Sequence, residues 1–219
     1  SLYIGGGFKK YRKTTANYLA KVDLHSGNLD TTFTQTSGAN DFISALVISG
    51  SALYAGGGFT TYRETAAPFL AKIDLTSGAL DPQFTQTKGL DQTVNTLAVV
   101  GGSLYVGGQF EAYRETPARR LAKLDLLSGD LDSTFTKKTG FNNEVSVLLG
   151  SVNSIYVGGN FTSYRGTPAN FLAKVHLISG EIDTTFTQPT GFDAPVFSLA
   201  LSTNALYVGG GFITYRGHY

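Results

Sequence analysis

The residues with the clearest potential for recognition are tyrosine–arginine pairs that recur at one spacing. Each pair follows the previous one after 51 residues, and the set is Tyr11 and Arg12, Tyr62 and Arg63, Tyr113 and Arg114, Tyr164 and Arg165, and Tyr215 and Arg216. Tyrosine and arginine give large contacts at modest entropic cost and are common in binding surfaces. The same residues suit a structural role, in which arginine ties adjacent loops through carbonyl groups or an aspartate and tyrosine packs over the sheet. The sequence leaves both interpretations open.

Charged residues repeat with the same period. A lysine stands two residues before an acidic residue or a histidine in the pairs Lys21 and Asp23, Lys72 and Asp74, Lys123 and Asp125, and Lys174 and His176. A buried lysine without a partner is costly, so we expect an ion pair or hydrogen-bond network between neighbouring repeats. A further aspartate follows a Ser-Gly turn in each repeat, namely Asp30, Asp81, Asp132 and Asp183. We expect these carboxylates to cap turns.

Neither set favours catalysis or metal binding. An enzyme needs an acid, a base or a nucleophile that is tuned at one place, and a calcium site needs several carboxylates close in sequence. His176 replaces an acidic residue, and His25 lies in a turn of another repeat. We therefore predict no catalytic residue, no metal site and no cofactor.

The periodicity covers the whole chain of 219 residues. Near-copies of the stretch from Leu53 to Thr65 begin at Leu2, Leu104, Ile155 and Leu206. Four full repeats run from Leu2 to Ala205, and a fifth continues to Tyr219. A fixed period of this length indicates a repeat architecture. We expect residues 1–219 to form a single domain.

Each repeat is predicted to contain four short strands. In the second repeat these are residues 53–59 with a glycine pair, residues 69–75 with alternating faces, residues 81–86 around Phe84, and the apolar residues 94–100. A glycine pair inside a strand marks the close approach of another backbone. Four strands in a repeat of this length are typical of a β-propeller blade.

We therefore predict an all-β fold, a β-propeller of four-stranded blades. Innermost strands occur four times, second strands five times, and third and outer strands four times each. Five blade positions with the first and last incomplete account for this count. A chain cut from a longer propeller explains it most simply, and a closing blade shared between the two ends is the alternative. Exposed strand edges at both ends would favour self-association.

In such a propeller, two sets of loops open on one face. The tyrosine–arginine loops join second and third strands, and the loops that enter each inner strand carry Leu90, Phe141 and Phe192. We therefore predict a binding face composed of the five tyrosine–arginine pairs together with Phe141 and Phe192.

Composition narrows the class of partner. The net charge is +1 and charged residues make up 15% of the chain, so we expect neither nucleic acid nor anionic membranes as partners. Apolar runs are shorter than the ~20 residues of a membrane helix, so we expect no membrane insertion. The chain has no cysteine and no methionine, not even at position 1. We interpret it as a processed product or a fragment of a bacterial surface or secreted protein.

The repeated pattern, clearest from Ile155 to Thr187, resembles the delta-60-type β-propeller repeats of bacterial surface and secreted proteins. It is more distantly similar to kelch-type repeats through its double glycine. The resemblance covers the whole chain and implies a propeller in an extracellular setting, without an assigned activity. His218 departs from the pattern, because Thr65, Thr116 and Thr167 occupy its position in other repeats.

These observations predict a non-enzymatic extracellular β-propeller module for binding, adhesion, or surface display and assembly. Its partner would be a protein or a glycan on the loop face. The alternative is a carbohydrate-binding, lectin-like propeller with pockets between blades, against which the absence of tryptophan counts. A hydrolase with a central site is the third hypothesis, and no acid–base pair unique to one repeat supports it.

Overall fold

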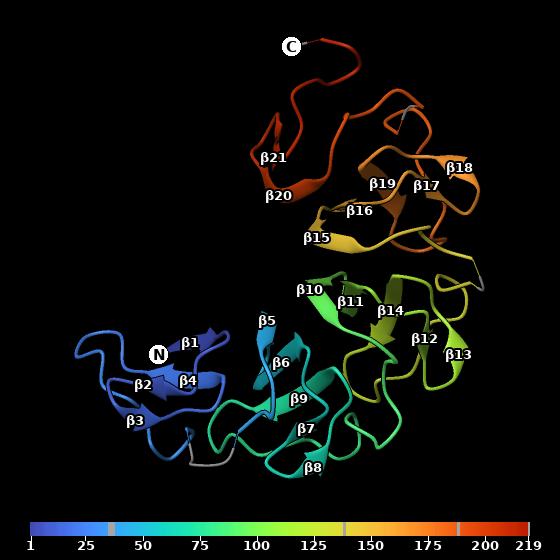
Figure 1. The fold of residues 1–219 in the computed structure, drawn as a ribbon. Coiled ribbons are helices and arrows are strands. Elements are labelled where there is room, and N and C mark those ends of the chain that lie inside the picture. The colour runs from blue at the N-terminus through green and yellow to red at the C-terminus, as the bar shows by residue number, and fades with distance from the viewer. Residues whose placement is uncertain (35–37, 138, 188, 219) are drawn as a thin grey trace.

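The fold is built entirely from short antiparallel strands. The computed structural model describes residues 1–34, 38–137, 139–187 and 189–218, and every named element within them is a β-strand. Apart from four two-stranded hairpins, the strands form five successive sheets that follow one another around an open arc, with the two ends of the chain on either side of the opening (Figure 1). The predicted all-β fold is confirmed.

We number the sheets 1 to 5 in chain order. Sheet 1 pairs β1 (Leu2–Gly5) with β4 (Leu19–Val22). Sheets 2 to 4 have three strands each, in the orders β5 (Ile43–Ser49), β6 (Ala52–Gly57), β9 (Leu70–Asp74); β10 (Val94–Val100), β11 (Ser103–Gly108), β14 (Leu121–Asp125); and β15 (Val145–Gly150), β16 (Ser154–Gly159), β19 (Leu172–His176). Sheet 5 pairs β20 (Val196–Leu201) with β21 (Leu206–Gly210). The inner strands β5, β10, β15 and β20 face the concave side of the arc (Figure 1).

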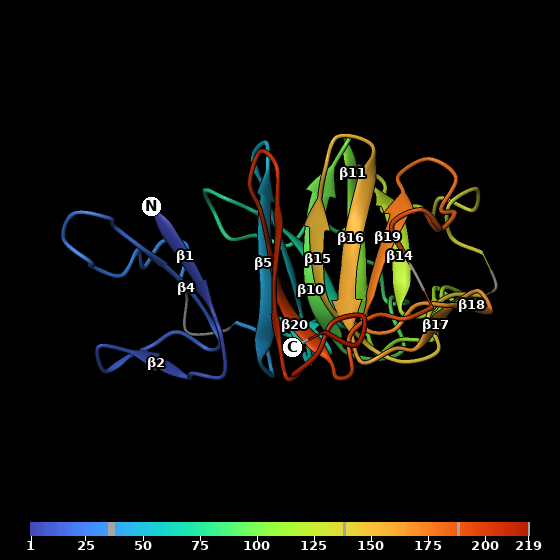
Figure 2. The same ribbon diagram turned by 90° about the horizontal axis from the view of Figure 1, so that it is seen from above.

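The tyrosine–arginine loops form two-residue hairpins. These are β2 (Lys10–Tyr11) with β3 (Thr14–Thr15), β7 (Thr61–Tyr62) with β8 (Thr65–Ala66), β12 (Ala112–Tyr113) with β13 (Thr116–Pro117), and β17 (Ser163–Tyr164) with β18 (Thr167–Pro168). Figure 2 shows β2, β17 and β18 at the same edge of the arc. The hairpins therefore lie on one face of the molecule, as predicted.

The predicted fourth strand of each blade is wrong. In sheet 2 its place is taken by a single bridge between Ile73 and Leu80, followed by a turn in which Thr85 N donates to Asp81 O at 2.8 Å. The Asp81 carboxylate caps this turn by accepting from Phe84 N at 3.2 Å, and Thr85 Oγ1 accepts from Lys72 N at 3.0 Å. Because side chains satisfy backbone groups that a ladder would use, the segment closes as a turn. The same bridge and turn follow β4, β14 and β19.

The glycine pairs allow backbones to approach closely. A methyl group on Gly107 would lie 2.6 Å from Val145 Cγ1 of the next sheet. One on Gly108 would run into Thr93 O of its own sheet. The first glycine therefore permits contact between sheets, which confirms the predicted role of the pair, and the second permits contact within a sheet.

Adjacent sheets share apolar cores. One core joins Leu121 and Phe135 of sheet 3 to Phe161, Ala173 and Val175 of sheet 4, and each of these side chains is at most 4% exposed. Sheets 1 and 2 and sheets 2 and 3 form equivalent cores. Each sheet therefore depends on its neighbours for burial, as in other repeat proteins. The described residues contain no helix that is long and apolar enough to span a membrane.

Candidate functional site

The three middle tyrosines of the predicted binding face are buried within the blades. Tyr62, Tyr113 and Tyr164 are 2–3% exposed. Each hydroxyl donates to a glycine carbonyl of the following turn: Tyr11 to Gly27, Tyr62 to Gly78, Tyr113 to Gly129 and Tyr164 to Gly180, at 2.7–3.0 Å. Burial raises the pKa of Tyr113 to about 12, although the adjacent Arg114 opposes this shift. These tyrosines hold the hairpins against the turns that follow the third strands.

The arginines tie each sheet to the one before it. One guanidinium nitrogen donates to a phenylalanine carbonyl of the preceding repeat: Arg63 to Phe33, Arg114 to Phe84, Arg165 to Phe135 and Arg216 to Phe186, at 2.5–3.3 Å. The side chains of Arg114 and Arg165 are 18% and 12% exposed. Each of these guanidinium groups also lies over its neighbouring tyrosine ring, at 4.9 Å for Arg114 and 4.8 Å for Arg165. This is the structural arrangement that the sequence left open.

The two predicted sets of loops do lie together. Isolated bridges join Ala39 to Tyr62, Leu90 to Tyr113, Phe141 to Tyr164 and Phe192 to Tyr215. Phe141 is 1% exposed, and its ring centre lies 4.5 Å from that of Tyr164. Phe192 is 7% exposed and stacks on Tyr215 at 4.6 Å. The predicted residues therefore lie together, but most of their side-chain surface is buried against the protein itself. Among the tyrosines of the set, Tyr215 at the C-terminal end is 37% exposed.

The lysines pair within a repeat, and with a different aspartate than expected. Their Nζ atoms lie 2.8–3.0 Å from the turn-capping carboxylates in Lys21 and Asp30, Lys72 and Asp81, Lys123 and Asp132, and Lys174 and Asp183. The predicted connection between repeats survives as a weaker contact, in which Lys21 Nζ donates to Leu75 O at 3.2 Å. The hydrogen bonds from Lys174 and the Thr185 hydroxyl hold the pKa of Asp183 well below its usual value.

Asp23, Asp74 and Asp125, the partners predicted for the lysines, cap the turn after the third strand instead. Asp125 Oδ1 accepts from Leu127 N and Ser128 N, both at 2.8 Å. A backbone hydrogen bond from Ser128 is the main reason that the pKa of Asp125 is lowered. In sheet 4 the residue at this position is His176, which has no carboxylate to offer. The repeat is therefore altered at this turn.

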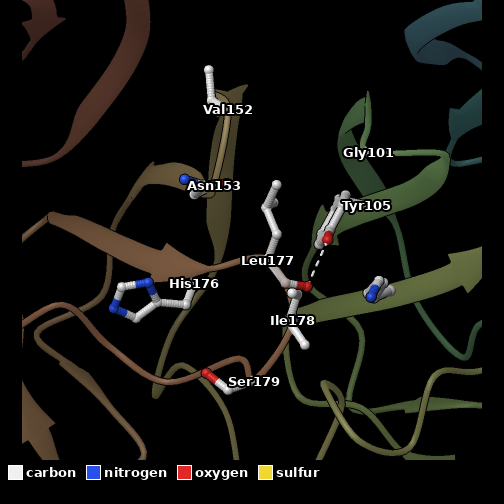
Figure 3. A pocket seen from close by; sticks show the side chains of 9 residues that line it. Gly101, Tyr105, Val152, Asn153, His176, Leu177, Ile178 and Ser179 are labelled. Atoms are coloured by element: carbon white, nitrogen blue, oxygen red, sulfur yellow. Dashed lines mark hydrogen bonds between the residues drawn. The ribbon is translucent and has the colours of Figure 1, made fainter.

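A groove opens beside His176, between sheets 3 and 4. Its volume is about 470 Å³, and it is lined on the sheet 4 side by Val152, Asn153 and residues 176–179. Figure 3 shows His176, Leu177 and Ile178 on one side of it, with Tyr105 and Gly101 on the other. The Tyr105 hydroxyl crosses between the sheets to donate to Leu177 O at 2.9 Å. Sequence reasoning missed this groove, although the exception at His176 pointed to it.

Three features set this groove apart from the boundary between sheets 2 and 3. Val152 and Asn153 replace Gly101 and Gly102, and His176 replaces Asp125. Val152 is 88% exposed, and Ile178, in the turn after His176, is 81% exposed. In the described part of the chain, no cluster of three or more histidines and acidic residues could hold a metal ion. The groove therefore combines exposed aliphatic side chains with amide, imidazole and hydroxyl groups.

Comparison with known proteins agrees with this architecture. Residues 1–33, 102–135 and 153–186 match a family described as a domain of unknown function (DUF5122) beta-propeller. The chain is a β-propeller repeat protein. The matched segments each contain a second strand, the tyrosine–arginine hairpin and a third strand of the propeller, which are the residues on which the sequence-based resemblance rests.

Solved structures resemble this propeller in fold alone. The computationally designed Ika4 protein has a TM-score of 0.51 at 14% identity, with 80% of this chain and 88% of that chain covered. The computationally designed Ika8 protein has a TM-score of 0.59 at 14% identity, with 93% of this chain covered. This chain covers 51% of Ika8, about half of its length. The search of curated proteins gave no match.

Proposed function

We propose that this propeller is a non-enzymatic binding module that acts outside the cell, and that the groove between sheets 3 and 4 receives a segment of a polypeptide partner. The observation that carries the proposal is the local break in the repeat. Tyrosines, arginines, lysines and aspartates that recur in several repeats have partners inside the protein, whereas the groove residues Val152, Asn153 and His176 are particular to one boundary.

The chemistry of the groove suits a polypeptide. Val152 and Ile178 expose aliphatic groups that would leave water on binding, which is the main source of affinity in such contacts. Asn153, His176 and Ser179 supply donors and acceptors that could bond to a peptide backbone or to polar side chains. Aliphatic side chains together with a few polar groups are a usual lining of a recognition site.

A glycan is the second candidate partner, because the groove lies between blades as the lectin-like hypothesis predicted. Sugar binding commonly uses the open face of an aromatic ring. The aromatic side chain in the groove, Tyr105, is 1% exposed and packs edge-on against Phe135 at 5.3 Å. This arrangement favours a polypeptide over a glycan.

Catalysis is left out of the proposal for a physical reason. The nine described residues that line the groove include no carboxylate, and Lys123 is already paired with Asp132 at 2.8 Å. General acid–base chemistry at His176 would need a neighbour that tunes or orients its imidazole. The groove as lined offers binding groups instead.

The test is a binding screen with matched variants. A random peptide display library and a glycan array serve as probes of the purified chain. We expect enrichment of peptides whose binding is lost in Ile178→Glu and kept in Leu127→Glu, which places the same charge at the equivalent exposed turn of sheet 3. Enrichment of glycans alone would favour the lectin-like alternative. Equal binding by both variants would overturn the assignment to this groove.

A separate measurement tests the extracellular location. On intact cells of the source organism, the protein should be accessible to an antibody and to added protease. Protection of the protein until the cells are lysed would contradict this part of the proposal.

A further inference from the structure

The first tyrosine–arginine hairpin carries a concentration of positive charge that the later hairpins lack. Residues 9–13 read Lys-Lys-Tyr-Arg-Lys, and residues 1–22 contain no aspartate or glutamate. The net charge of +1 for the whole chain conceals this local excess. Short segments this rich in lysine and arginine are typical of surfaces that bind polyanions.

The repeat shows which residues create the excess. Arg12 does not, because every repeat has an arginine at its position. The lysines do, because none of their positions holds a basic residue in any later repeat. The equivalents are Thr60, Glu111, Thr162 and Ile213 for Lys9; Thr61, Ala112, Ser163 and Thr214 for Lys10; and Glu64, Glu115, Gly166 and Gly217 for Lys13.

The three lysines are exposed to solvent, and this exposure is a property of the hairpin. Lys9, Lys10 and Lys13 are all exposed. The same positions are exposed or half-buried in the hairpins of sheets 2 to 4, which have a neighbouring sheet on each side. In Figure 2, β2 lies on the same face of the molecule as β17 and β18, at the other end of that face. The lysines therefore add their charge to the loop face.

No acidic side chain of the described residues neutralises these lysines. None of the ion pairs in the described part of the chain includes them. The next acidic residues along the chain have other partners, since Asp23 accepts from Ser26 N at 2.8 Å and Asp30 Oδ2 lies 3.0 Å from Lys21 Nζ. The lysine ammonium groups are therefore available to an external anion.

The hairpin presents the lysines from a fixed backbone. Its two strands pair with Lys10 opposite Thr15. Arg12 and Lys13 form the turn with φ of 43° and 73°, the two positive values of a tight two-residue hairpin. Because the backbone is already ordered, binding would cost only the freedom of the lysine side chains.

The aromatic residue of the hairpin favours a polyanion without bases. Tyr11 is half-buried, its hydroxyl donates to Gly27 O at 2.9 Å, and the Arg12 guanidinium lies over its ring at 5.5 Å. Proteins that bind single-stranded nucleic acid combine positive charge with aromatic rings on which bases stack. This hairpin offers charge with little free ring surface, which suits a polymer that carries carboxylate or sulfate groups.

We propose that Lys9, Lys10 and Lys13 form a binding surface for an anionic polysaccharide, recognised through the carboxylate or sulfate groups along its chain. Lysine is a compact point charge on a flexible stem, so it can follow anionic groups that are irregularly placed. The surface is separate from the groove between sheets 3 and 4, and it does not depend on the polypeptide binding proposed there.

Biolayer interferometry of the full chain tests the proposal with four immobilised probes. Heparin carries sulfate groups, polygalacturonate carries carboxylate groups, dextran is neutral, and single-stranded DNA is a polyanion with bases. We expect saturable binding to heparin or polygalacturonate and none to dextran. Comparison of the first two probes shows which anionic group is preferred. Binding should weaken as sodium chloride is raised, because salt screens exposed charges.

Two triple variants with the same net charge separate the lysine surface from a general effect of charge. The combined change Lys9→Gln, Lys10→Gln and Lys13→Gln should weaken polysaccharide binding roughly ten-fold or more. The control changes basic residues that are 65%, 58% and 50% exposed and paired with acidic side chains, namely Lys88→Gln, Arg119→Gln and Lys137→Gln. It should bind like the parent.

Three results would overturn the proposal: no binding to either anionic polysaccharide at low salt, an equal loss in both triple variants, or tighter binding to DNA than to the polysaccharides. Circular dichroism shows whether the variants keep their strands. If the lysine triple does not fold, Lys13→Glu decides the question, because glutamate occupies this position in the second and third hairpins. Unchanged polysaccharide binding in that variant would contradict the assignment.

Discussion

At the scale of single residues, the tyrosine–arginine pair acts as a clamp between sheets. The Arg114 guanidinium donates to Phe84 O at 2.8 Å and covers the ring of Tyr113, whose hydroxyl is itself bonded to Gly129 O. One short sequence motif therefore fixes a hairpin to its own blade and to the preceding one. This accounts for its recurrence without any ligand.

Arg114→Ala should lower the free energy of unfolding by roughly 1.5–3 kcal/mol, since a charge-assisted hydrogen bond to a largely buried carbonyl is lost. Urea denaturation measures the change. Arg119→Ala is the control, because its side chain is 58% exposed and its pairing with Glu111 lies at the surface. Surface ion pairs contribute about 0–1 kcal/mol. A similar loss in both variants would count against the clamp.

The lysine–aspartate pairs predict how stability depends on pH. The hydrogen bonds from Lys174 and Thr185 lower the pKa of Asp183 in the folded protein. A lowered folded-state pKa means that the stabilisation is present above the unfolded value of about 3.9 and is lost as pH falls further. Thermal melting between pH 6 and pH 2 should therefore show a fall in stability at the acid end.

Asp183→Asn should reduce the slope of this acid limb and should also lower stability at pH 6, because Lys174 loses its charged partner. Asp193→Asn provides a comparison, since that carboxylate is exposed and accepts hydrogen bonds from the backbone amides of Ile213 and Thr214. An acid limb unchanged by Asp183→Asn would show that other carboxylates control it.

At the scale of the element, close approach explains why glycine pairs interrupt the second strands. Gly108→Ala would place a methyl group against Thr93 O and 3.0 Å from the Val94 Cα. Backbone atoms cannot rotate away, so the inner strand must shift, and overpacking of this kind costs about 1–3 kcal/mol.

We expect Gly108→Ala to lower the melting temperature clearly, and Gly7→Ala to leave it nearly unchanged, because a methyl group on Gly7 would meet no atom within 4 Å. Differential scanning calorimetry compares the two. If both variants melt like the parent, the strands have more freedom to separate than the packing indicates.

The sequence correctly predicted the strands in which side chains alternate between two faces and the strands that contain a recurring apolar run. The inner, second and third strands were predicted from residues 94–100, from the double glycine and from the alternation around Ile73, and all three are present. The fourth strand was wrong because Phe84 is buried by a turn as well as it would be by a strand. Burial of one aromatic residue does not reveal whether the backbone bonds to a ladder or to the Asp81 and Thr85 side chains.

The candidate site was harder to predict for a related reason. The sequence of a tyrosine–arginine pair is the same whether its side chains face solvent or bond to a neighbouring carbonyl group. Which of the two occurs depends on contacts with residues 30 positions away. The groove depends on Val152 and His176, which differ from the residues at the same positions of other repeats. The sequence alone does not show that the two turns containing these residues lie next to each other in space.

At the scale of the whole molecule, the sheets at the two ends of the arc differ from the three-stranded sheets in its middle. Inner strands of neighbouring sheets contact one another from β5 through β20. Sheets 1 and 5 each lie at an end of the arc, with a neighbour on one side only, and the ends lie apart (Figure 1). In such an array, stability is close to a sum of repeat and neighbour terms.

We therefore expect amide hydrogen exchange to be slowest in β10 and β11 of sheet 3, and fastest in β1, β20 and β21. Exchange followed by mass spectrometry measures this gradient, which reflects local opening from the ends. Uniform protection of all five sheets would indicate that the ends are joined in solution. The number of blades in the ring, predicted as five positions, stays a prediction.

The hydroxyl contacts between sheets carry a consequence for how such a chain can change over generations. Tyr3, Tyr54 and Tyr105 each donate to a leucine carbonyl 72 residues later, and the arginine contacts each reach back 30 residues. The boundaries between sheets 1 and 2, sheets 2 and 3, and sheets 3 and 4 thus use the same offsets. Recombination that adds or deletes one 51-residue copy would recreate each contact without a compensating substitution. The gene can therefore lengthen or shorten its product in whole blades while the joints between them stay the same.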